Sequence, residues 1–389
     1  MQYLTDPKSG NKLSVLGFGC MRFPMDANKT EKLVISAINA GVNYFDTAYI
    51  YGNSETILGG ILYKNNVRDR IYLATKLPYQ KCRIYDDFDR LFLEQLERLK
   101  TDHIDYYLIH NLSDIRAWDN LCGLGIEKWI AEKKAGGQIS QIGFSFHGAR
   151  DAFMELLDLY DWDFCQIQYN YMDENYQAGK AGLKKAHEKG LPVIIMEPLL
   201  GGKLATGLPA KATKYFSETG DTGTAASWAL RWLWNQPEVT VVLSGMNGAD
   251  QLEDNLKTAE TAKAGMLKEK DAAVFGPVIA ALREAYKVPC TGCSYCMPCP
   301  QGVNIPDCFA AYNTSYAIGF ISGIILYITS TGLNRPEKNH SASGCIKCGA
   351  CEQKCPQKIG ISTSLTAVTK RMEPLLLRAV MRVVQKITK

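Results

Sequence analysis

Short runs of β-branched and aromatic residues alternate with longer amphipathic segments along the first two thirds of the chain. Segments such as EKLVISAINA and FDRLFLEQLERL carry apolar residues three and four positions apart, which is typical of helices. Between the amphipathic segments lie eight predicted strands, at residues 13–19, 42–46, 70–76, 104–110, 139–145, 164–170, 192–198 and 239–245. Eight strand–helix units predict an α/β fold, a closed (β/α)8 TIM barrel.

The alternation stops in the last third of the chain, where cysteines become frequent. Nine of the 13 cysteines lie beyond Val288. A chain of 389 residues is longer than most single domains. We therefore predict a barrel at residues 1–275 and a smaller, mainly helical domain at residues 276–389.

Composition and charge narrow the class of protein. A chain that is 46% hydrophobic and 22% charged can bury a sizeable core. A net charge of +4 is too small to suggest nucleic-acid binding, which needs a concentrated basic patch. The first residues, MQYLTDPKSGNKL, have no apolar region of a secretory signal, so a cytoplasmic protein is expected.

One apolar stretch, residues 309–328, approaches the length of about 20 residues that crosses a bilayer. Polar residues and two glycines interrupt it, and it lies between two groups of cysteines. We interpret it as a buried helix, and membrane contact is not expected.

Four residues with acid–base chemistry lie where predicted strands end. Asp46 ends the second strand, Tyr51 follows it, Lys76 ends the third strand and His110 ends the fourth. In such barrels the chemistry lies at the C-terminal ends of the strands. A carbonyl reduced by hydride transfer needs a proton, and a tyrosine, whose pKa is ordinarily about 10, becomes a better acid beside a cation. Lys76 can be that cation, Asp46 can hold it charged, and His110 can donate a hydrogen bond to the substrate oxygen.

The stretches FDTAYIYGNSE (45–55), TKL (75–77) and LIHN (108–111) resemble the active-site motifs of the aldo-keto reductases. The resemblance covers about residues 12–256. It implies an eight-stranded barrel, a catalytic tetrad of Asp46, Tyr51, Lys76 and His110 with Tyr51 as general acid and base, and a small carbonyl or alcohol substrate. It also implies a nicotinamide cofactor bound without a Rossmann fingerprint.

The same resemblance implies the cofactor residues. Ser145 and Gln166 match the positions that hold the carboxamide, although Phe146 replaces a usual Asn, and Met196 replaces the aromatic residue that stacks on the nicotinamide. Gly201 and Gly202 resemble the loop around the pyrophosphate. The adenosine site is matched by Ser244, Gly245, Asn247, Gln251, Asp254 and Asn255.

The resemblance also bears on the choice between NADH and NADPH. Family members specific for NADP place Lys and Arg where this chain has Gly245 and Gln251. Those cations would recognise the 2′-phosphate. Either cofactor fits the motifs, and NADH is slightly favoured.

Two cysteine runs dominate the last third. CIKCGACEQKCP (345–356) has the spacing of the bacterial ferredoxin run for a [4Fe-4S] cluster, whereas the run at 290–300 is one residue shorter before its fourth cysteine. Together they resemble the ferredoxin-type domains fused to some bacterial aldo-keto reductases. Because the fourth cysteine of each run crosses over in two-cluster ferredoxins, this implies one cluster on Cys290, Cys293, Cys296 and Cys355, and a second on Cys345, Cys348, Cys351 and Cys299.

Other assignments of these cysteines stay open. Cys308 is a spare ligand for Cys299, and zinc is the rival of the clusters because tetrahedral thiolate sites also use C-x2-C pairs. The 44 residues from 301 to 344 predict a helical insertion. Four further cysteines, scattered through the barrel, are interpreted as small apolar side chains: Cys20, Cys82, Cys122 and Cys165.

Basic residues concentrate in the tail at 361–389. Arg378, Arg382, Lys386 and Lys389 recur at helical spacing opposite apolar positions, which predicts a cationic amphipathic helix. It can pack on the protein with a solvated charged face. Alternatively, it can dock to a membrane surface or to an acidic electron carrier such as ferredoxin or flavodoxin.

Three functions therefore remain open at the level of sequence. The first is an NAD(P)H-dependent oxidoreductase that interconverts a carbonyl and an alcohol, with structural or redox-sensing clusters. The second is an electron-transfer protein that links a nicotinamide or substrate pool to a one-electron carrier. The third is a redox-sensing binding module. The complete tetrad favours the first.

Overall fold

The computed structural model describes residues 1–331 and 340–374, which form two compact units. The first unit comprises Met1–Leu199 and Ala226–Lys268, and the second comprises Leu200–Ala225 and the residues from Glu269 onward. This division differs from the predicted bounds of 1–275 and 276–389, because the segment after the seventh predicted strand belongs to the second unit, where α8 (Ala210–Glu218) packs with α12 (Phe275–Ala285). The predicted tail helix at 377–389 lies outside the described residues.

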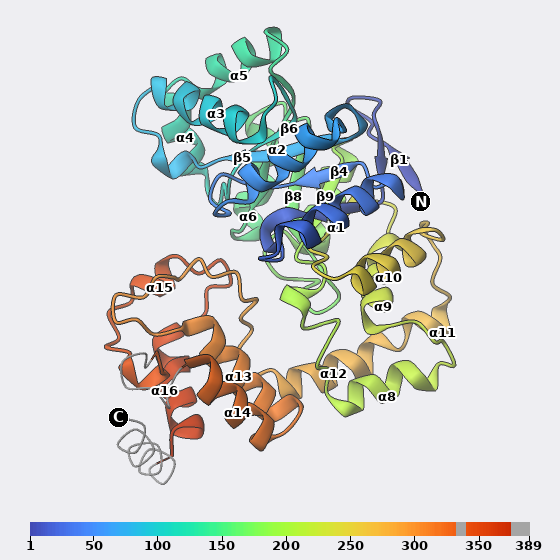
Figure 1. The fold of residues 1–389 in the computed structure, drawn as a ribbon, viewed down its shortest axis with the longest axis vertical. Coiled ribbons are helices and arrows are strands. Elements are labelled where there is room, and N and C mark those ends of the chain that lie inside the picture. The colour runs from blue at the N-terminus through green and yellow to red at the C-terminus, as the bar shows by residue number, and fades with distance from the viewer. Residues whose placement is uncertain (332–339, 375–389) are drawn as a thin grey trace. The chain divides into compact units, whose positions relative to one another are not determined.

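Eight parallel strands of the first unit close into a barrel (Figure 1). They are β3 (Leu16–Gly19), β4 (Tyr44–Asp46), β5 (Tyr72–Leu77), β6 (Ile104–Ile109), β7 (Ile139–Phe146), β8 (Phe164–Gln168), β9 (Val193–Met196) and β10 (Val241–Ser244). They follow one another in chain order around the barrel, and β10 pairs with β3 to close it. All eight predicted strands and the TIM-barrel class are confirmed.

Helices coat the barrel. They are α1 (Ala27–Asn39), α2 (Ser54–Asn65), α3 (Asp86–Leu99), α4 (Ile115–Gly123), α5 (Ile126–Ala135), α6 (Arg150–Leu159), α7 (Gly179–Glu188), α9 (Ala225–Trp234) and α10 (Ala249–Ala259). Their apolar stripes cover the outer face of the strands, so the strands are buried on both faces. This double burial is why their sequences are nearly continuous apolar runs.

An antiparallel hairpin of β1 (Tyr3–Thr5) and β2 (Lys12–Ser14) precedes the barrel. The strand predicted at residues 13–19 therefore corresponds to parts of two strands, β2 of this hairpin and β3 of the barrel. In the barrel interior Tyr106 stacks edge-on with Tyr44 and Phe164, with ring centroids 5.2 and 5.1 Å apart. The Tyr106 hydroxyl donates to Asp6 Oδ2 at 2.7 Å, which ties the hairpin loop to this aromatic layer.

The part of the second unit that the structure describes consists of helices, the two cysteine runs and connecting loops. In addition to α8 and α12 it contains α11 (Glu269–Ala272), α13 (Ile305–Ala317), α14 (Phe320–Thr331), α15 (Ala350–Gln353) and α16 (Ile361–Met372). The prediction of a helical insertion between the two cysteine runs is confirmed by α13 and α14. Asn313 of α13 accepts a hydrogen bond from the Val288 amide and donates one to the Val288 carbonyl, which fixes the start of the first cysteine run.

The prediction of one buried helix at 309–328 is wrong in two respects. The stretch forms two helices that separate at Ile318 and Gly319, and the outer face of α14 is exposed. The other face of α14 packs closely on α13, because a Cβ at Gly323 would lie 2.5 Å from the Cβ of Ser315. Within the described residues, no helix combines the length and apolarity needed to cross a membrane.

Candidate active site and cysteine-lined cavities

The barrel brings the four predicted acid–base residues to one end. Asp46 is the last residue of β4, Lys76 lies in β5 and His110 follows β6 directly. Tyr51 lies in the turn between β4 and α2. Since these strands are parallel and adjacent, their C-terminal ends meet at the same rim.

Asp46 and Lys76 form a buried ion pair. Lys76 Nζ lies 2.6 Å from Asp46 Oδ1 and also donates to the Thr47 carbonyl at 2.8 Å. Burial lowers the pKa of Lys76, and the Asp46 carboxylate opposes that effect. The pair therefore places a fixed ammonium at the end of the barrel without leaving either charge unpartnered.

The Tyr51 ring contacts both other members of the set. Lys76 Nζ lies 5.1 Å from its centroid, and the His110 ring meets it edge-on, with centroids 5.8 Å apart at 88°. Burial lowers the pKa of His110 well below its ordinary value, and the Lys76 cation adds to this. His110 is thus a neutral imidazole near pH 7, suited to hydrogen bonding and not to holding a charge.

Ser145 and Gln166 lie opposite each other on the neighbouring strands β7 and β8. Ser145 Oγ accepts from the Asn111 amide at 2.8 Å, so its own hydrogen can be donated to a ligand. Gln166 Nε2 donates to Asp46 Oδ2 at 2.8 Å, and no described residue donates to its Oε1. One donor and one acceptor side by side complement a carboxamide, so these residues fit the nicotinamide group that they are predicted to hold.

Most of the other predicted cofactor residues lie at the end of β9 or in the segment from the end of β10 through α10. Met196 ends β9, and Ser244 ends β10 and accepts a hydrogen bond from Asn255 Nδ2 at 2.9 Å. Gln251 Oε1 accepts from the Asn247 amide at 3.1 Å, at the start of α10. The remaining positions of the adenosine match lie in the same β10–α10 segment and are Gly245 and Asp254.

Gly201 and Gly202 belong to the second unit, unlike the rest of the predicted cofactor set. Gly201 has φ of 68°, and its backbone approaches Thr291 so closely that a Cβ there would collide with the Thr291 carbonyl. In the same loop, the Lys203 ammonium donates to the carbonyl of Cys290. The predicted pyrophosphate loop is therefore held against the first cysteine run.

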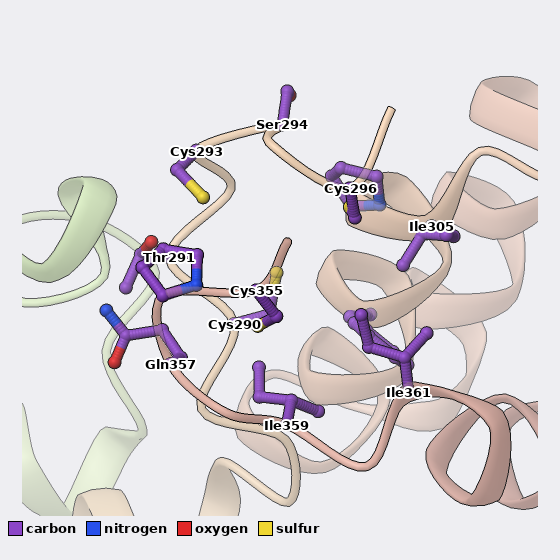
Figure 2. Close-up of a pocket in the computed structure, with 13 residues that line it drawn as sticks. Cys290, Thr291, Cys293, Ser294, Cys296, Ile305, Cys355, Gln357, Ile359 and Ile361 are labelled. Atoms are coloured by element: carbon purple, nitrogen blue, oxygen red, sulfur yellow. The ribbon is translucent and has the colours of Figure 1, made fainter. Parts of the chain in front are cut away.

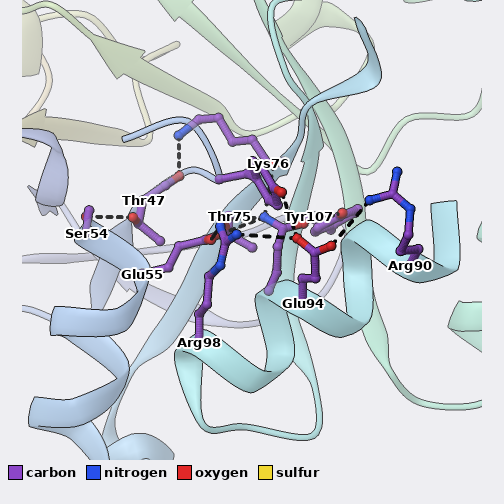
Figure 3. A network of polar contacts seen from close by, with 11 residues as sticks. Thr47, Ser54, Glu55, Thr75, Lys76, Arg90, Glu94, Arg98 and Tyr107 are labelled. Carbon is purple, nitrogen blue, oxygen red and sulfur yellow. Dashed lines mark hydrogen bonds and ion pairs between the residues drawn. The ribbon is translucent and has the colours of Figure 1, made fainter. Parts of the chain in front are cut away.

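A buried polar network behind Lys76 was missed at the level of sequence (Figure 3). Glu55 of α2 accepts from Thr75 Oγ1 at 2.6 Å and from Gln95 Nε2 at 2.7 Å. Gln95 of α3 also donates to the Lys76 carbonyl and accepts from the Tyr107 hydroxyl. Burial raises the pKa of Glu55. The signal in the sequence was Glu55, which ends the motif FDTAYIYGNSE, but its partners come from the strand β5 and the helix α3.

The predicted cluster ligands line two separate cavities of the second unit. The first cavity, shown in Figure 2, is lined by Cys290, Cys293, Cys296 and Cys355, together with apolar side chains that include Ile305. The second is lined by Cys299, Cys345, Cys348 and Cys351. Each run thus sends its fourth cysteine to the cavity of the other run, and Cys308 lines neither.

The two cysteine runs also fold alike. The amide two residues after the first cysteine of each run donates to that cysteine's Sγ at 3.4 Å, from Gly292 to Cys290 and from Lys347 to Cys345. Both donors have positive φ, as do Ser294 and Gly349 two residues further on. Matching left-handed positions wrap each run around its own cavity.

Each of the two cavities is lined by four cysteine side chains. Four cysteine thiolates are the ligand set of a [4Fe-4S] cluster. Zinc can also be held by four thiolates.

A comparison with protein families agrees with this architecture. The model of the aldo/keto reductase family matches residues 15–266, about two thirds of the chain. The chain belongs to the aldo/keto reductase family. A second model, of the 4Fe-4S dicluster domain, matches residues 289–359 of this aldo/keto reductase. Both resemblances stated from the sequence are confirmed, and the chain is an oxidoreductase with a fused iron-sulfur domain.

Individual relatives match about two thirds of this chain. The uncharacterized oxidoreductase YrpG of Bacillus subtilis is 26% identical over 310 residues, which cover 67% of this chain and 91% of that protein. The 6-dehydroglucose reductase of Novosphingobium aromaticivorans is 27% identical over 274 residues, covering 63% and 86%. The solved holo form of an aldo-keto reductase from Bacillus halodurans covers 72% of this chain and 96% of its own, with a TM-score of 0.59 and 23% identity, which shows the shared fold alone.

Proposed function

We propose that this aldo/keto reductase interconverts an aldehyde or ketone with the corresponding alcohol, using NADH or NADPH. The observation that carries the proposal is the contact of the Tyr51 ring with both Lys76 and His110, beside the buried Asp46–Lys76 pair. The nicotinamide, when bound, supplies or accepts the hydride.

The four residues divide the acid–base work. Tyr51 protonates the developing alkoxide and takes the proton back in the reverse reaction. Lys76 favours the tyrosinate, and Asp46 keeps Lys76 charged and oriented. The neutral His110 donates a hydrogen bond to the carbonyl oxygen and fixes its approach to Tyr51.

The cofactor residues act by orientation. The Ser145 hydroxyl and Gln166 Oε1 hold the carboxamide, Met196 packs on the nicotinamide ring, and Gly201 and Gly202 accommodate the pyrophosphate. The adenosine end is held by Ser244, Gly245, Asn247, Gln251, Asp254 and Asn255. Because Gly245 and Gln251 carry no positive charge for a 2′-phosphate, we infer a slight preference for NADH.

The second unit holds two [4Fe-4S] clusters in this proposal. Cys290, Cys293, Cys296 and Cys355 hold the first, and Cys299, Cys345, Cys348 and Cys351 hold the second; the two cavities with four thiols each support this assignment. Clusters need reduced thiolates, which favours a cytoplasmic protein.

A second candidate function is electron exchange with an external one-electron carrier, such as an acidic ferredoxin or flavodoxin. It is favoured by the exposure of Cys348, which brings the second cavity close to the surface. Hydride carries two electrons and each cluster accepts one, so relay from the cofactor needs a further group that splits the pair.

An anaerobic titration of the purified protein tests both functions. NADH and then NADPH are added, absorbance and low-temperature EPR follow the clusters, and a panel of aldehydes and ketones reports turnover. Carbonyl reduction with clusters that stay oxidised supports the first function alone. Cluster reduction during turnover supports the second, and an absence of both cofactor binding and carbonyl reduction would refute the first.

A further inference from the structure

The outer face of α14 is apolar and open to solvent. Ile321 and Ile325 are 75% and 59% exposed, and three further apolar side chains on or beside the helix are also exposed, namely Ile318, Phe320 and Leu326. We call these five residues the α14 face. Single exposed apolar residues are ordinary, but five grouped on and beside one short helix mark a binding surface.

The sequence around this face carries no charge of its own. From Cys308 to Thr331 there is no Asp, Glu, Lys or Arg. The opposite side of α14 packs on α13 through Gly323, and its Tyr327 donates to Glu373 at the end of α16. One side of α14 is therefore packed within the second unit, and the opposite side is exposed to solvent.

Two cations flank the α14 face. The Arg371 guanidinium lies 3.8 Å from the ring centroid of Tyr316 and 5.2 Å from that of Phe320, and Lys287 Nζ lies 5.1 Å from the Tyr316 ring. Arg371 also donates to Ser315 Oγ at 2.7 Å, which fixes its position. Aromatic rings topped by cations beside an aliphatic face are typical of side chains at a lipid–water interface.

The chain that follows α16 adds charge of the same sign. Residues 375–389, which lie outside the described residues, contain four basic residues and no acidic one. In the sequence they follow closely after Glu373, which accepts the hydrogen bond from Tyr327 of α14. Apolar contact and basic charge together give stable membrane association where either one alone is marginal.

We propose that the α14 face binds the surface of an anionic lipid bilayer, with its aliphatic side chains below the headgroups and Arg371 and Lys287 among the phosphates. The protein would lie on the bilayer without spanning it. A soluble acidic partner would match the cations but not the five apolar side chains. A second copy of the chain would bury the apolar side chains but bring like charges together across a two-fold axis.

Flotation of the intact, cluster-loaded protein with lipid vesicles tests the proposal. Binding is expected to vesicles of phosphatidylcholine and phosphatidylglycerol, to weaken as salt is raised, and to be much lower with phosphatidylcholine alone. The double variant Ile321→Ser, Ile325→Ser should lower the partition coefficient roughly tenfold to a hundredfold. Cluster absorbance and circular dichroism check that this variant is folded.

The matched control is Ile84→Ser with Leu93→Ser, two residues of the first unit that are 60% and 54% exposed. The control should bind vesicles like the parent protein. Equal loss in the control, or no binding of the parent to anionic vesicles, would overturn the proposal. So would a parent dimer that the Ile321, Ile325 variant converts to a monomer, or binding that requires removal of residues 375–389.

Discussion

Lys76 Nζ lies 2.6 Å from Asp46 Oδ1, and the two side chains are only 1% and 6% exposed. Both would be costly to bury singly, because removing one partner of a buried pair leaves an uncompensated charge at about 3–5 kcal/mol. Asp46 is also held through its second carboxylate oxygen, which accepts a hydrogen bond from Gln166. The ammonium beside Tyr51 is thus fixed by the architecture of three strands.

The substitution Lys76→Met is expected to lower kcat/KM for carbonyl reduction by about 10²–10⁴, because Tyr51 loses the cation that favours its deprotonation. Steady-state NAD(P)H oxidation measures the effect. Lys64→Met is the matched control: its side chain is 68% exposed and pairs with Glu31 at 2.8 Å, so activity should stay within about twofold. An unchanged kcat/KM in a folded Lys76→Met protein would exclude the proposed role.

The pKa of His110 gives a pH dependence to the stability of the barrel. Burial lowers that pKa, so below about pH 6.5 the unfolded chain binds a proton that the folded chain does not. The free energy of unfolding therefore falls as the pH falls. Between pH 7.5 and pH 5.5, this residue alone should lower the free energy of unfolding by about 1.4 kcal/mol. The variant His110→Gln should lack this part of the decrease.

Urea unfolding followed by tryptophan fluorescence measures this, because all six tryptophans lie in the first unit. The exposed His187, substituted by Gln, serves as control and should leave the difference between the two pH values as in the parent. If His110→Gln retained the parent's full pH dependence, the buried neutral imidazole would not be its source.

The sequence predicted the barrel and the meeting of Asp46, Lys76 and His110 well, because parallel strands buried on both faces are apolar throughout and end at a common rim. It did not predict that α14 exposes an apolar face, since apolar content alone does not say which side of a helix is covered. Nor did it predict that the loop at 200–203 packs on Thr291, because such contacts depend on tertiary structure.

Gln95 connects Glu55 to the backbone of Lys76, so Gln95→Leu should weaken both stability and catalysis. The substitution leaves the Tyr107 hydroxyl without its acceptor and Glu55 without one donor, at an expected total of about 2–4 kcal/mol in the free energy of unfolding. The loss of kcat/KM should be smaller than the loss expected for Lys76→Met, because the ammonium itself remains. Arg90→Ala, on an exposed ion pair of the same helix, should change stability by no more than about 0.5 kcal/mol.

Pairs of cysteine substitutions test the crossing of the fourth ligands. Cys290→Ala with Cys355→Ala removes two thiols of one cavity and should leave one cluster, with about four iron atoms per chain. Cys290→Ala with Cys299→Ala removes thiols of both cavities and should leave neither cluster. Iron analysis and EPR of anaerobically reconstituted protein measure this. The reverse pattern would mean that each run holds its own cluster, and Cys308→Ala should lose no iron in either case.

Lys203 places a positive charge against the first cysteine run, where its ammonium donates to the Cys290 carbonyl. A cation there stabilises the reduced, more negative cluster, so Lys203→Met should make the potential of that cluster more negative, on the order of 50 mV. An EPR-monitored redox titration resolves the shift. Lys211→Met, whose 68% exposed side chain pairs with Glu284 in the same unit, should leave the potential unchanged. Equal potentials in the Lys203→Met and parent proteins would show that this contact holds the loop without tuning the cluster.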